Sequence, residues 1–254
     1  MKKTHCHRDE FKQYADNLLQ ISRFKDYCPN GLQVQGKDQL SLLVSGVTAS
    51  QALIEAAIEA QADAILVHHG WFWRNDEAQI VGQLHKRLKL LMDHDINLLA
   101  YHLPLDAHPT LGNNAQLARV ASWQVTGQSP ENELLWLGKP ANEGVSLAEF
   151  ANDLGRSLGR EPLLIGEKEK PIHKIAWCTG AAQGYLSEAI QLGVDVFISG
   201  EISESTFHLA QEFGVAYIAA GHHATERYGV QALGTELANK FGIQHQFIDI
   251  FNPV

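Results

Sequence analysis

Histidine and carboxylate side chains gather in three short segments of this chain, each of which follows an apolar run. The stretch AILVHH ends in two histidines, and the stretches INLLAY and VAYIAAG lead into the other two segments. The clustered side chains are His68, His69, His102, Asp106, His222 and Glu226. Imidazole and carboxylate ligands together suit Zn, Mn, Fe or Ni, and mixed sets with an open position are typical of hydrolytic centres. The three segments therefore predict a metal site.

The number of ligands is sufficient for two divalent ions if one carboxylate bridges them. Two ions roughly 3.5–4 Å apart can share an attacking water and hold both oxygens of a displacement. His102 lies about one helical turn from Asp106, which favours a role as general acid or base, or as a hydrogen-bond partner of a ligand. The metal ligands that we expect are His68, His69, Asp106, His222 and Glu226.

Each segment taken alone has a simpler interpretation. Two adjacent histidines at a strand end are often a surface pair, and His222 and Glu226, four residues apart, can form a hydrogen bond at the start of a helix. Three such segments after three apolar strands favour the metal site over these alternatives.

Two further residues are candidates for binding substrate, His108 and Glu201. His108 follows Asp106 closely, and Glu201 occupies the position that His69 has in the repeat described below. The aromatic run at 71–73 can be core, an interface between subunits or a stacking wall for a planar base. Because aromatic residues are enriched at interfaces, we favour packing or an interface.

The segments around these residues alternate between strand and helix patterns. This rhythm is typical of parallel sheets, whose sites lie beyond the carboxyl ends of the strands. Neighbouring side chains on a strand point to opposite faces, so His68 and His69 are expected in the loop after the strand. Ser146 and Glu149 form the pattern of a capping box that opens a helix. The expected strands are 40–47, 64–67, 96–101, 172–178, 195–200, 215–221 and 244–250, with helices between them, including 79–94, 183–192 and 204–213.

The second half of the chain looks like a repeat of the first. EAAIEAQADAILVHHG can be aligned with SEAIQLGVDVFISGE, which matches Asp63 with Asp195, and a later alignment matches His102 with His222. We therefore expect an α/β protein of two similar three-layer α/β domains that arose by internal duplication. The expected division is 1–124 plus 227–254 for the first domain and 125–226 for the second.

Bulk properties narrow the class of protein. The net charge of the 254-residue chain is −9 and no basic run is present, which argues against electrostatic binding of nucleic acid without excluding it. No stretch of about 18 apolar residues and no signal-peptide pattern occurs, so we expect no membrane span. Three widely spaced cysteines fit a reducing compartment, and we expect a cytoplasmic protein.

Five motifs occur in a fixed order along the chain: DYCPNGLQVQG, ILVHHGWFW, HLPLDAHPTLGNN, ISGE and GHHATERYGVQAL. Together they resemble the Nif-three-like (YbgI-type) family, whose members are often labelled GTP cyclohydrolase 1 type 2 homologues. The resemblance covers essentially the whole chain. It implies two similar α/β domains, a ring-shaped homohexamer and a dinuclear metal centre in each subunit. One departure is His223, where we expect tyrosine in the family, and this histidine can compete with its neighbour for a metal.

The resemblance also implies how the ligands divide between the ions. His68 and Asp106 would hold one ion, His69 and His222 the other, and Glu226 would bridge them. The implied cofactor is two divalent ions, which can be Zn, Mn, Fe or Ni.

The predicted function is that of a metal-dependent hydrolase that acts on a nucleotide or phosphoester through a metal-bound water, with His102 moving a proton. The family label implies opening of the GTP ring, and a phosphoesterase uses the same centre equally well. The alternative is a metal-binding ring without turnover that acts as a scaffold, a metal-handling protein or a regulatory or DNA-repair-associated protein. Fold alone does not choose between these functions.

Overall fold

The computed structural model describes residues 5–254 and divides the chain into two compact units. Unit 1 is the chain up to Gly112 together with Gly229–Phe251, and unit 2 is Asn113–Tyr228 together with Asn252–Val254. The divisions expected from the sequence lie after residues 124 and 226 instead. Helix α5 (Asn113–Val120) therefore belongs to unit 2.

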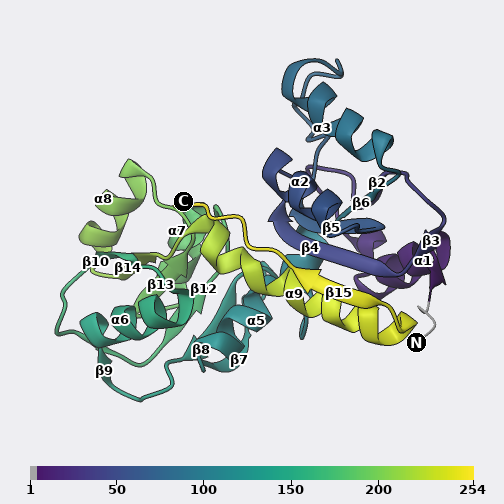
Figure 1. The fold of residues 1–254 in the computed structure, drawn as a ribbon. Coiled ribbons are helices and arrows are strands. Elements are labelled where there is room, and N and C mark those ends of the chain that lie inside the picture. Colours follow the sequence, from purple (N-terminus) through teal and green to yellow (C-terminus); the bar gives the residue numbers. More distant parts are fainter. Residues whose placement is uncertain (1–4) are drawn as a thin grey trace. The chain divides into compact units, whose positions relative to one another are not determined.

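Unit 1 is built on a five-stranded sheet with the strand order β15-β4-β5-β6-β2 (Figure 1). Its strands are β2 (Gly31–Val34), β4 (Leu42–Thr48), β5 (Ala64–His69), β6 (Asn97–Ala100) and β15 (Gln244–Phe247). Neighbouring strands are parallel except β2, which pairs antiparallel with β6. The continuous apolar run of β5 matches its central position, because a parallel strand covered on both faces needs apolar side chains on both.

Different helices cover the two faces of this sheet. α2 (Gln51–Glu59) and α3 (Gly82–Asp93) pack on one face, and α1 (Arg8–Leu18) and the later part of α9 (His222–Phe241) pack on the other (Figure 1). Each pair closes its own cluster of buried apolar side chains, so unit 1 has three layers. Its shorter elements are β1 (Cys6–His7), the 3-10 helix η1 (Ile21–Arg23), β3 (Gln39–Leu40) and α4 (Leu103–Ala107).

Unit 2 has a six-stranded sheet with the order β10-β14-β13-β12-β8-β7. Its strands are β7 (Gln124–Gln128), β8 (Trp136–Lys139), β10 (Leu163–Ile165), β12 (Ile175–Trp177), β13 (Val196–Ser199) and β14 (Ala216–Ala219). The three central strands are parallel, and the outer strands are added antiparallel at both edges. The β7–β8 hairpin and β10 are absent from the sequence-based prediction.

Unit 2 also has three layers. α5, α6 (Leu147–Leu158) and the first turn of α9 cover one face of its sheet, whereas α7 (Leu186–Gln191) and α8 (Glu204–Phe213) cover the other. The predicted capping box at the start of α6 is confirmed, because Ser146 and Glu149 bond each other's main-chain N–H groups. Its remaining elements are β9 (Val145–Ser146), β11 (Pro171–Ile172) and the 3-10 helix η2 (Gln183–Tyr185).

An aspartate has the same place in both sheets. Asp63 Oδ2 accepts main-chain N–H bonds from residues 41–42, just before or at the start of β4, at 2.6 and 3.0 Å. Asp195 Oδ2 accepts the equivalent bonds from residues 173–174, just before β12, both at 2.8 Å. The two aspartates are the pair that the sequence alignment matches. Together with the shared layer order, this detail supports the duplication and the predicted fold class.

Strand pairing changes the second part of the alignment by one residue. Ala64 pairs with Asn97 in unit 1, and Val196 pairs with Ala216 in unit 2. Counting from these pairs, His102 corresponds to Gly221 instead of His222. The apolar letters of the two strands are too similar to fix this register, whereas hydrogen bonding does.

Strand β5 continues through both histidines, so the expectation that His68 and His69 lie beyond the strand is wrong. The strand pairing persists because Thr48 pairs with His69, and Ala49 N donates to His69 O at 2.9 Å. Among the described residues, none of the helices is sufficiently long and apolar to cross a membrane.

Candidate functional site

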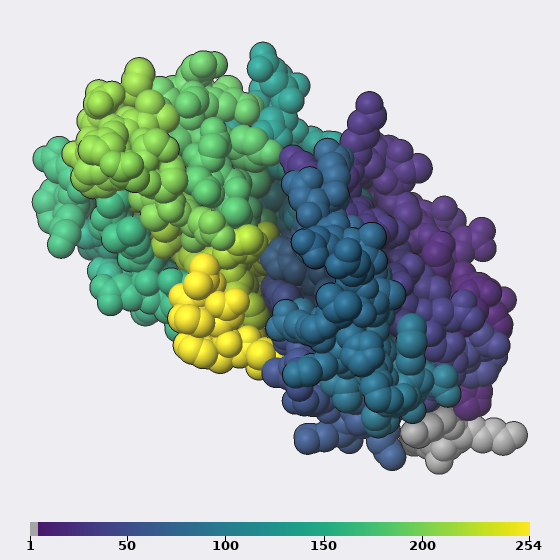
Figure 2. All heavy atoms as spheres, turned by 90° about the horizontal axis from the view of Figure 1, so that it is seen from above, coloured from purple at the N-terminus to yellow at the C-terminus, as the bar shows by residue number. Residues whose placement is uncertain are grey.

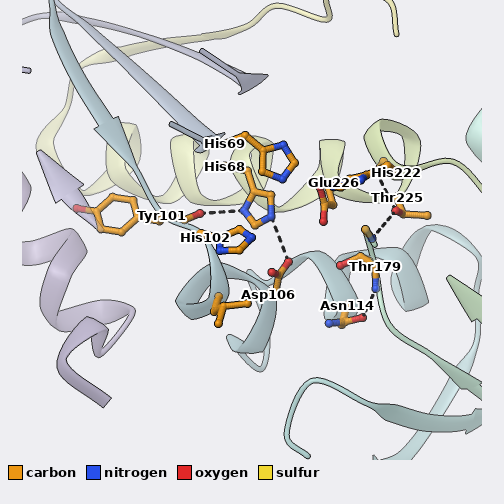
Figure 3. Close-up of polar contacts among 12 residues, drawn as sticks. His68, His69, Tyr101, His102, Asp106, Asn114, Thr179, His222, Thr225 and Glu226 are labelled. Carbon is orange, nitrogen blue, oxygen red and sulfur yellow. Dashed lines mark hydrogen bonds and ion pairs between the residues drawn. The ribbon is translucent and has the colours of Figure 1, made fainter. Parts of the chain in front are cut away.

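His68 is fully buried at the end of β5 and is held in one orientation. Its Nδ1 lies 2.9 Å from the carbonyl oxygen of Tyr101, which can only accept a hydrogen bond (Figure 3). Nδ1 therefore carries the proton, and Nε2 is the nitrogen available as a ligand. That Nε2 lies 3.5 Å from Oδ1 of Asp106, which α4 positions and buries (Figure 3).

Three imidazoles come together in unit 1. His68, His69 and His102 each present a ring nitrogen within 4.8 Å of the others. The ring centroids of His68 and His102 are 5.0 Å apart, and Nδ1 of His69 lies 3.3 Å from the hydroxyl of Thr48. Three imidazole nitrogens at this spacing are a chemically suitable ligand set for a divalent transition metal.

Asp26 fixes the orientation of His102. Its Oδ1 accepts from His102 Nδ1 at 2.7 Å and from Tyr27 N at 2.6 Å, and its Oδ2 accepts from Asn30 Nδ2 at 2.8 Å and from Leu103 N at 2.9 Å. Burial alone would raise the pKa of Asp26, but the bonds from His102, Asn30 and Tyr27 lower it to about 2. The carboxylate is thus ionised and has four donors, which leaves Nε2 of His102 as the nitrogen that can exchange a proton or bind a metal.

His108, the candidate substrate residue of unit 1, has a structural contact of its own. Its Nδ1 accepts the main-chain N–H groups of Thr110 and Leu111 at 3.3 and 3.0 Å, which closes the turn after α4. Burial lowers the pKa of His108, so its neutral form is favoured.

In unit 2, His222 lies between two carboxylates at the start of α9. Its Nδ1 is 2.7 Å from Oε1 of Glu201, and its Nε2 is 3.1 Å from Oε2 of Glu226. Burial opposes protonation, but Glu226 and Glu201 outweigh it and raise the pKa of His222 to about 9. A metal that binds at Nε2 must displace this proton, which is the usual linkage between metal binding and pH.

Two glycines make room for this pair. Gly180, with φ of +69°, lies so close to Glu226 that an added Cβ would overlap its Oε1, and it would come 3.3 Å from Nε2 of His222. A Cβ at Gly200 would lie 2.7 Å from the Cα of His222. Thr225 holds the loop in place, because its hydroxyl accepts from Gly180 N at 3.1 Å (Figure 3).

The structure thus groups the sequence candidates within each unit. Unit 1 brings His68, His69, His102 and Asp106 together, and unit 2 brings His222, Glu226 and Glu201 together. His223 is buried, and its N–H donates to Val254 O at 3.0 Å.

Sequence reasoning missed three residues that position these groups, Asp26, Gly180 and Thr225. Asp26 opens a motif that the sequence analysis singles out, but its distance in sequence from His102 gives no sign of their contact. The positive φ of Gly180 and the hydroxyl contact of Thr225 depend on the tertiary structure and leave no local signal.

Comparisons with known proteins agree on one family. A family model described as Duf34/NIF3 (NGG1p interacting factor 3) matches residues 6–253. A protein of Pseudomonas aeruginosa named GTP cyclohydrolase 1 type 2 homolog is 55% identical over 242 residues, covering 94% of this chain and 95% of that protein. A protein of the same name from Allochromatium vinosum is 52% identical over 242 residues, covering 95% of each chain.

A solved structure has nearly the same fold. The protein ybgI, described as of unknown function, superimposes with a TM-score of 0.95 at 44% sequence identity, covering 98% of this chain and 100% of that chain. The similarity extends over both units, so the two proteins share the two-unit organisation.

Proposed function

Because this chain belongs to the Duf34/NIF3 family, we propose that it is a dinuclear metal-dependent hydrolase that acts on a nucleotide or phosphoester. The name of its relatives, GTP cyclohydrolase 1 type 2 homolog, suggests GTP as the first substrate to test. The ligands of the proposed ions are those predicted from the sequence. They are His68, His69 and Asp106 from unit 1 and His222 and Glu226 from unit 2.

The observation that carries the proposal is a shared feature of three histidines. His68, His102 and His222 each direct Nδ1 at an oxygen, those of Tyr101, Asp26 and Glu201 respectively. Histidines that bind metal through Nε2 typically donate Nδ1–H to a carboxylate or carbonyl, which fixes the tautomer and the orientation of the ring. Of these three histidines, His68 and His222 are proposed ligands and His102 is the proposed proton carrier, so the same arrangement orients both kinds of group.

The residues present fit a divalent ion chemically. The imidazole nitrogens of unit 1 lie within 4.8 Å of one another, and Gly180 leaves the space that the carboxylate of Glu226 occupies. Divalent ions bound here would supply Lewis acidity and lower the pKa of a coordinated water. Glu201 and the carbonyl of Tyr101 orient the ligands, and Nε2 of His102, held by Asp26, accepts or donates the proton that moves in the reaction.

Three accompanying expectations concern the state of the protein in the cell. We propose that it assembles as a homohexameric ring, works in the cytoplasm and holds Zn, Mn, Fe or Ni according to supply. Size-exclusion chromatography with light scattering tests the first, and elemental analysis of protein from the native host tests the last.

The decisive experiment measures metal and turnover in the same samples. Untagged wild type, Glu226→Gln and His68→Ala are compared with His208→Ala, which removes an exposed histidine away from the cluster. We expect two ions per chain in wild type and in the control, and one or none in the other two variants. Turnover of GTP or of a simple phosphoester is expected to follow the metal content.

Two results would overturn the proposal in different ways. Wild type with two ions but no turnover of any nucleotide or phosphoester would favour the metal-binding ring that acts as a scaffold or metal-handling protein. Wild type without bound metal would remove the dinuclear centre itself.

A further inference from the structure

Two aromatic side chains lie near His102 in unit 1, and an arginine packs against one of them; neither the proposed metal ligands nor the core accounts for these three side chains. The ring of Trp73 lies 5.0 Å from that of His102, nearly perpendicular to it at 85°. The ring of Tyr27 lies 6.4 Å from His102 on a separate segment of the chain. Tyr27 is 56% exposed, and Trp73 is half-buried. We call Tyr27, Trp73 and Arg74 the aromatic rim.

The aromatic run at 71–73 divides between core and rim. Trp71 is buried and donates its indole N–H to the carbonyl of Ala49 at 3.0 Å, which is the packing role expected from the sequence. Phe72 then adopts φ of +65°, in the left-handed region that is unfavourable for a bulky residue. After this turn Trp73 leaves the core and reaches His102 and His69. Strained backbone of this kind tends to occur at ligand sites.

Arg74 joins the two segments of the rim. Its main-chain N–H donates to Tyr27 O at 2.7 Å, and its Nη2 donates to Asp26 O at 3.0 Å. Its guanidinium lies 5.5 Å from the centroid of the Tyr27 ring. Arg74 is exposed, in the largely exposed segment 72–83 that forms part of the blue surface of Figure 2. A cation held against Tyr27, whose ring is in turn near His102, matters in a chain with a net charge of −9, because an anionic substrate is otherwise repelled.

We propose that the aromatic rim binds the base and phosphate of a nucleotide, so that the substrate is a nucleotide and not a simple phosphoester. An aromatic ring stacks with any planar base, and a guanidinium forms paired hydrogen bonds with phosphate oxygens. This inference rests on the proposed function, and it narrows that function to one substrate class. It assigns Trp73 and Tyr27 to the base and Arg74 to the phosphate.

The test measures binding of the base and binding of the phosphate separately, by calorimetric titration of the full chain as purified. The probes are guanosine, ribose 5-phosphate and guanosine 5′-monophosphate. We expect Trp73→Leu to weaken binding of guanosine and of the nucleotide at least fivefold, and to leave ribose 5-phosphate unchanged. Arg74→Gln is expected to weaken the two phosphorylated probes and to leave guanosine unchanged.

Matched controls remove an exposed aromatic ring and an exposed arginine elsewhere. Phe213→Leu and Arg156→Gln, both in unit 2, are expected to bind all three probes as wild type does. Light scattering of each variant shows whether the rim instead holds subunits together. A change of oligomeric state in Trp73→Leu without loss of guanosine binding would overturn the proposal, as would equal binding of ribose 5-phosphate and the nucleotide by wild type.

Failure of this inference is distinguishable from failure of the proposed function. If the protein holds two ions and hydrolyses p-nitrophenyl phosphate but does not bind guanosine, the proposal for the aromatic rim is wrong and the proposed hydrolase function stands. If guanosine binding depends on Trp73 but the protein holds no metal, the proposal for the aromatic rim stands and the proposed hydrolase function is wrong.

Discussion

The central strands of the two units correspond closely, but the residues at their carboxyl ends do not. β5 ends in His68 and His69, whereas the equivalent positions after β13 are Gly200 and Glu201. Unit 1 therefore supplies imidazoles directly from a strand. Unit 2 has a small residue there, which leaves space for His222 on α9.

The difference shows where a duplicated α/β scaffold can vary. The aspartates that hold neighbouring strands, Asp63 and Asp195, make the same main-chain bonds in both units. The order of the three central strands and the layers also agree, so these features are common to both units. The strand ends carry no such requirement, and they can supply a ligand in one unit and space for a ligand in the other.

Gly180→Ala is expected to have the largest effect, because it fills the space that the Glu226 carboxylate occupies in unit 2. The methyl group would overlap the Glu226 carboxylate, and the positive φ adds strain, so we expect a loss of about 3 kcal/mol in stability. Metal content should also fall below that of wild type. Urea unfolding and elemental analysis measure the two effects.

Gly144→Ala is the matched control for this variant. It has a similar φ of +71°, but an added Cβ would only reach His173 at 3.5 Å. It should lose about 1 kcal/mol and retain its metal. Equal metal loss in both variants would show that strain alone, and not the position of Glu226, is responsible.

The two repeated aspartates provide the next comparison. Asp63→Asn should cost about 2–3 kcal/mol, because a buried carboxylate loses charge-assisted bonds and its contact with Lys37 Nζ at 2.9 Å. Asp195→Asn should cost about 1 kcal/mol, since Asp195 is half-buried. Urea unfolding of both variants gives the difference, and a larger cost for Asp195→Asn would contradict the ranking by burial.

Much of the scaffold could be predicted from sequence because its signals are local. Apolar runs identified the three central parallel strands of each unit, and α8 was predicted with the observed bounds, 204–213. The β7–β8 hairpin was missed because all residues of β7 are exposed and give no apolar pattern. Exposed strands at a sheet edge are held by backbone hydrogen bonds, which the sequence does not display.

Residue types predicted the candidate ligands but not the groups that orient them. His68 and His222 stand out as histidines next to apolar runs. The carbonyl of Tyr101 and the carboxylate of Asp26 contribute through contacts over 33 and 76 residues of sequence. Such long-range contacts depend on the folded sheet, and one sequence alone does not contain them.

The two histidine–carboxylate contacts should respond to opposite ends of the pH scale in metal-free protein. The pKa of Asp26 is lowered to about 2 from an ordinary value near 3.8. The contact between Asp26 and His102 therefore contributes to the free energy of unfolding above pH 3.8, and this contribution is lost as the pH falls to 2. The pKa of His222 is raised to about 9. The contacts of His222 with its carboxylates therefore contribute fully to the free energy of unfolding below about pH 6.5, and this contribution is lost as the pH rises through 9. Each contribution is about 1–2 kcal/mol.

Urea unfolding of chelator-treated protein at several pH values measures both windows. Asp26→Asn should remove the acid dependence only, and Glu201→Gln should reduce the alkaline dependence only. Loss of stability at alkaline pH that persists unchanged in Glu201→Gln would contradict the assignment to His222.

The smallest expected effect concerns the partners of the ligands, and it tests whether both units orient histidines in the same way. Glu201→Gln keeps a hydrogen-bond acceptor near Nδ1 of His222 but removes the charge, so metal affinity should fall about tenfold. Asp26→Asn acts through His102 in unit 1 and should lower turnover more than metal content, because His102 is expected to move a proton. Competition with a metal-sensitive dye measures affinity, and steady-state rates measure turnover. If Asp26→Asn instead lowers metal affinity as much as Glu201→Gln does, His102 is a metal ligand. Both units would then use a carboxylate to orient a metal-binding histidine.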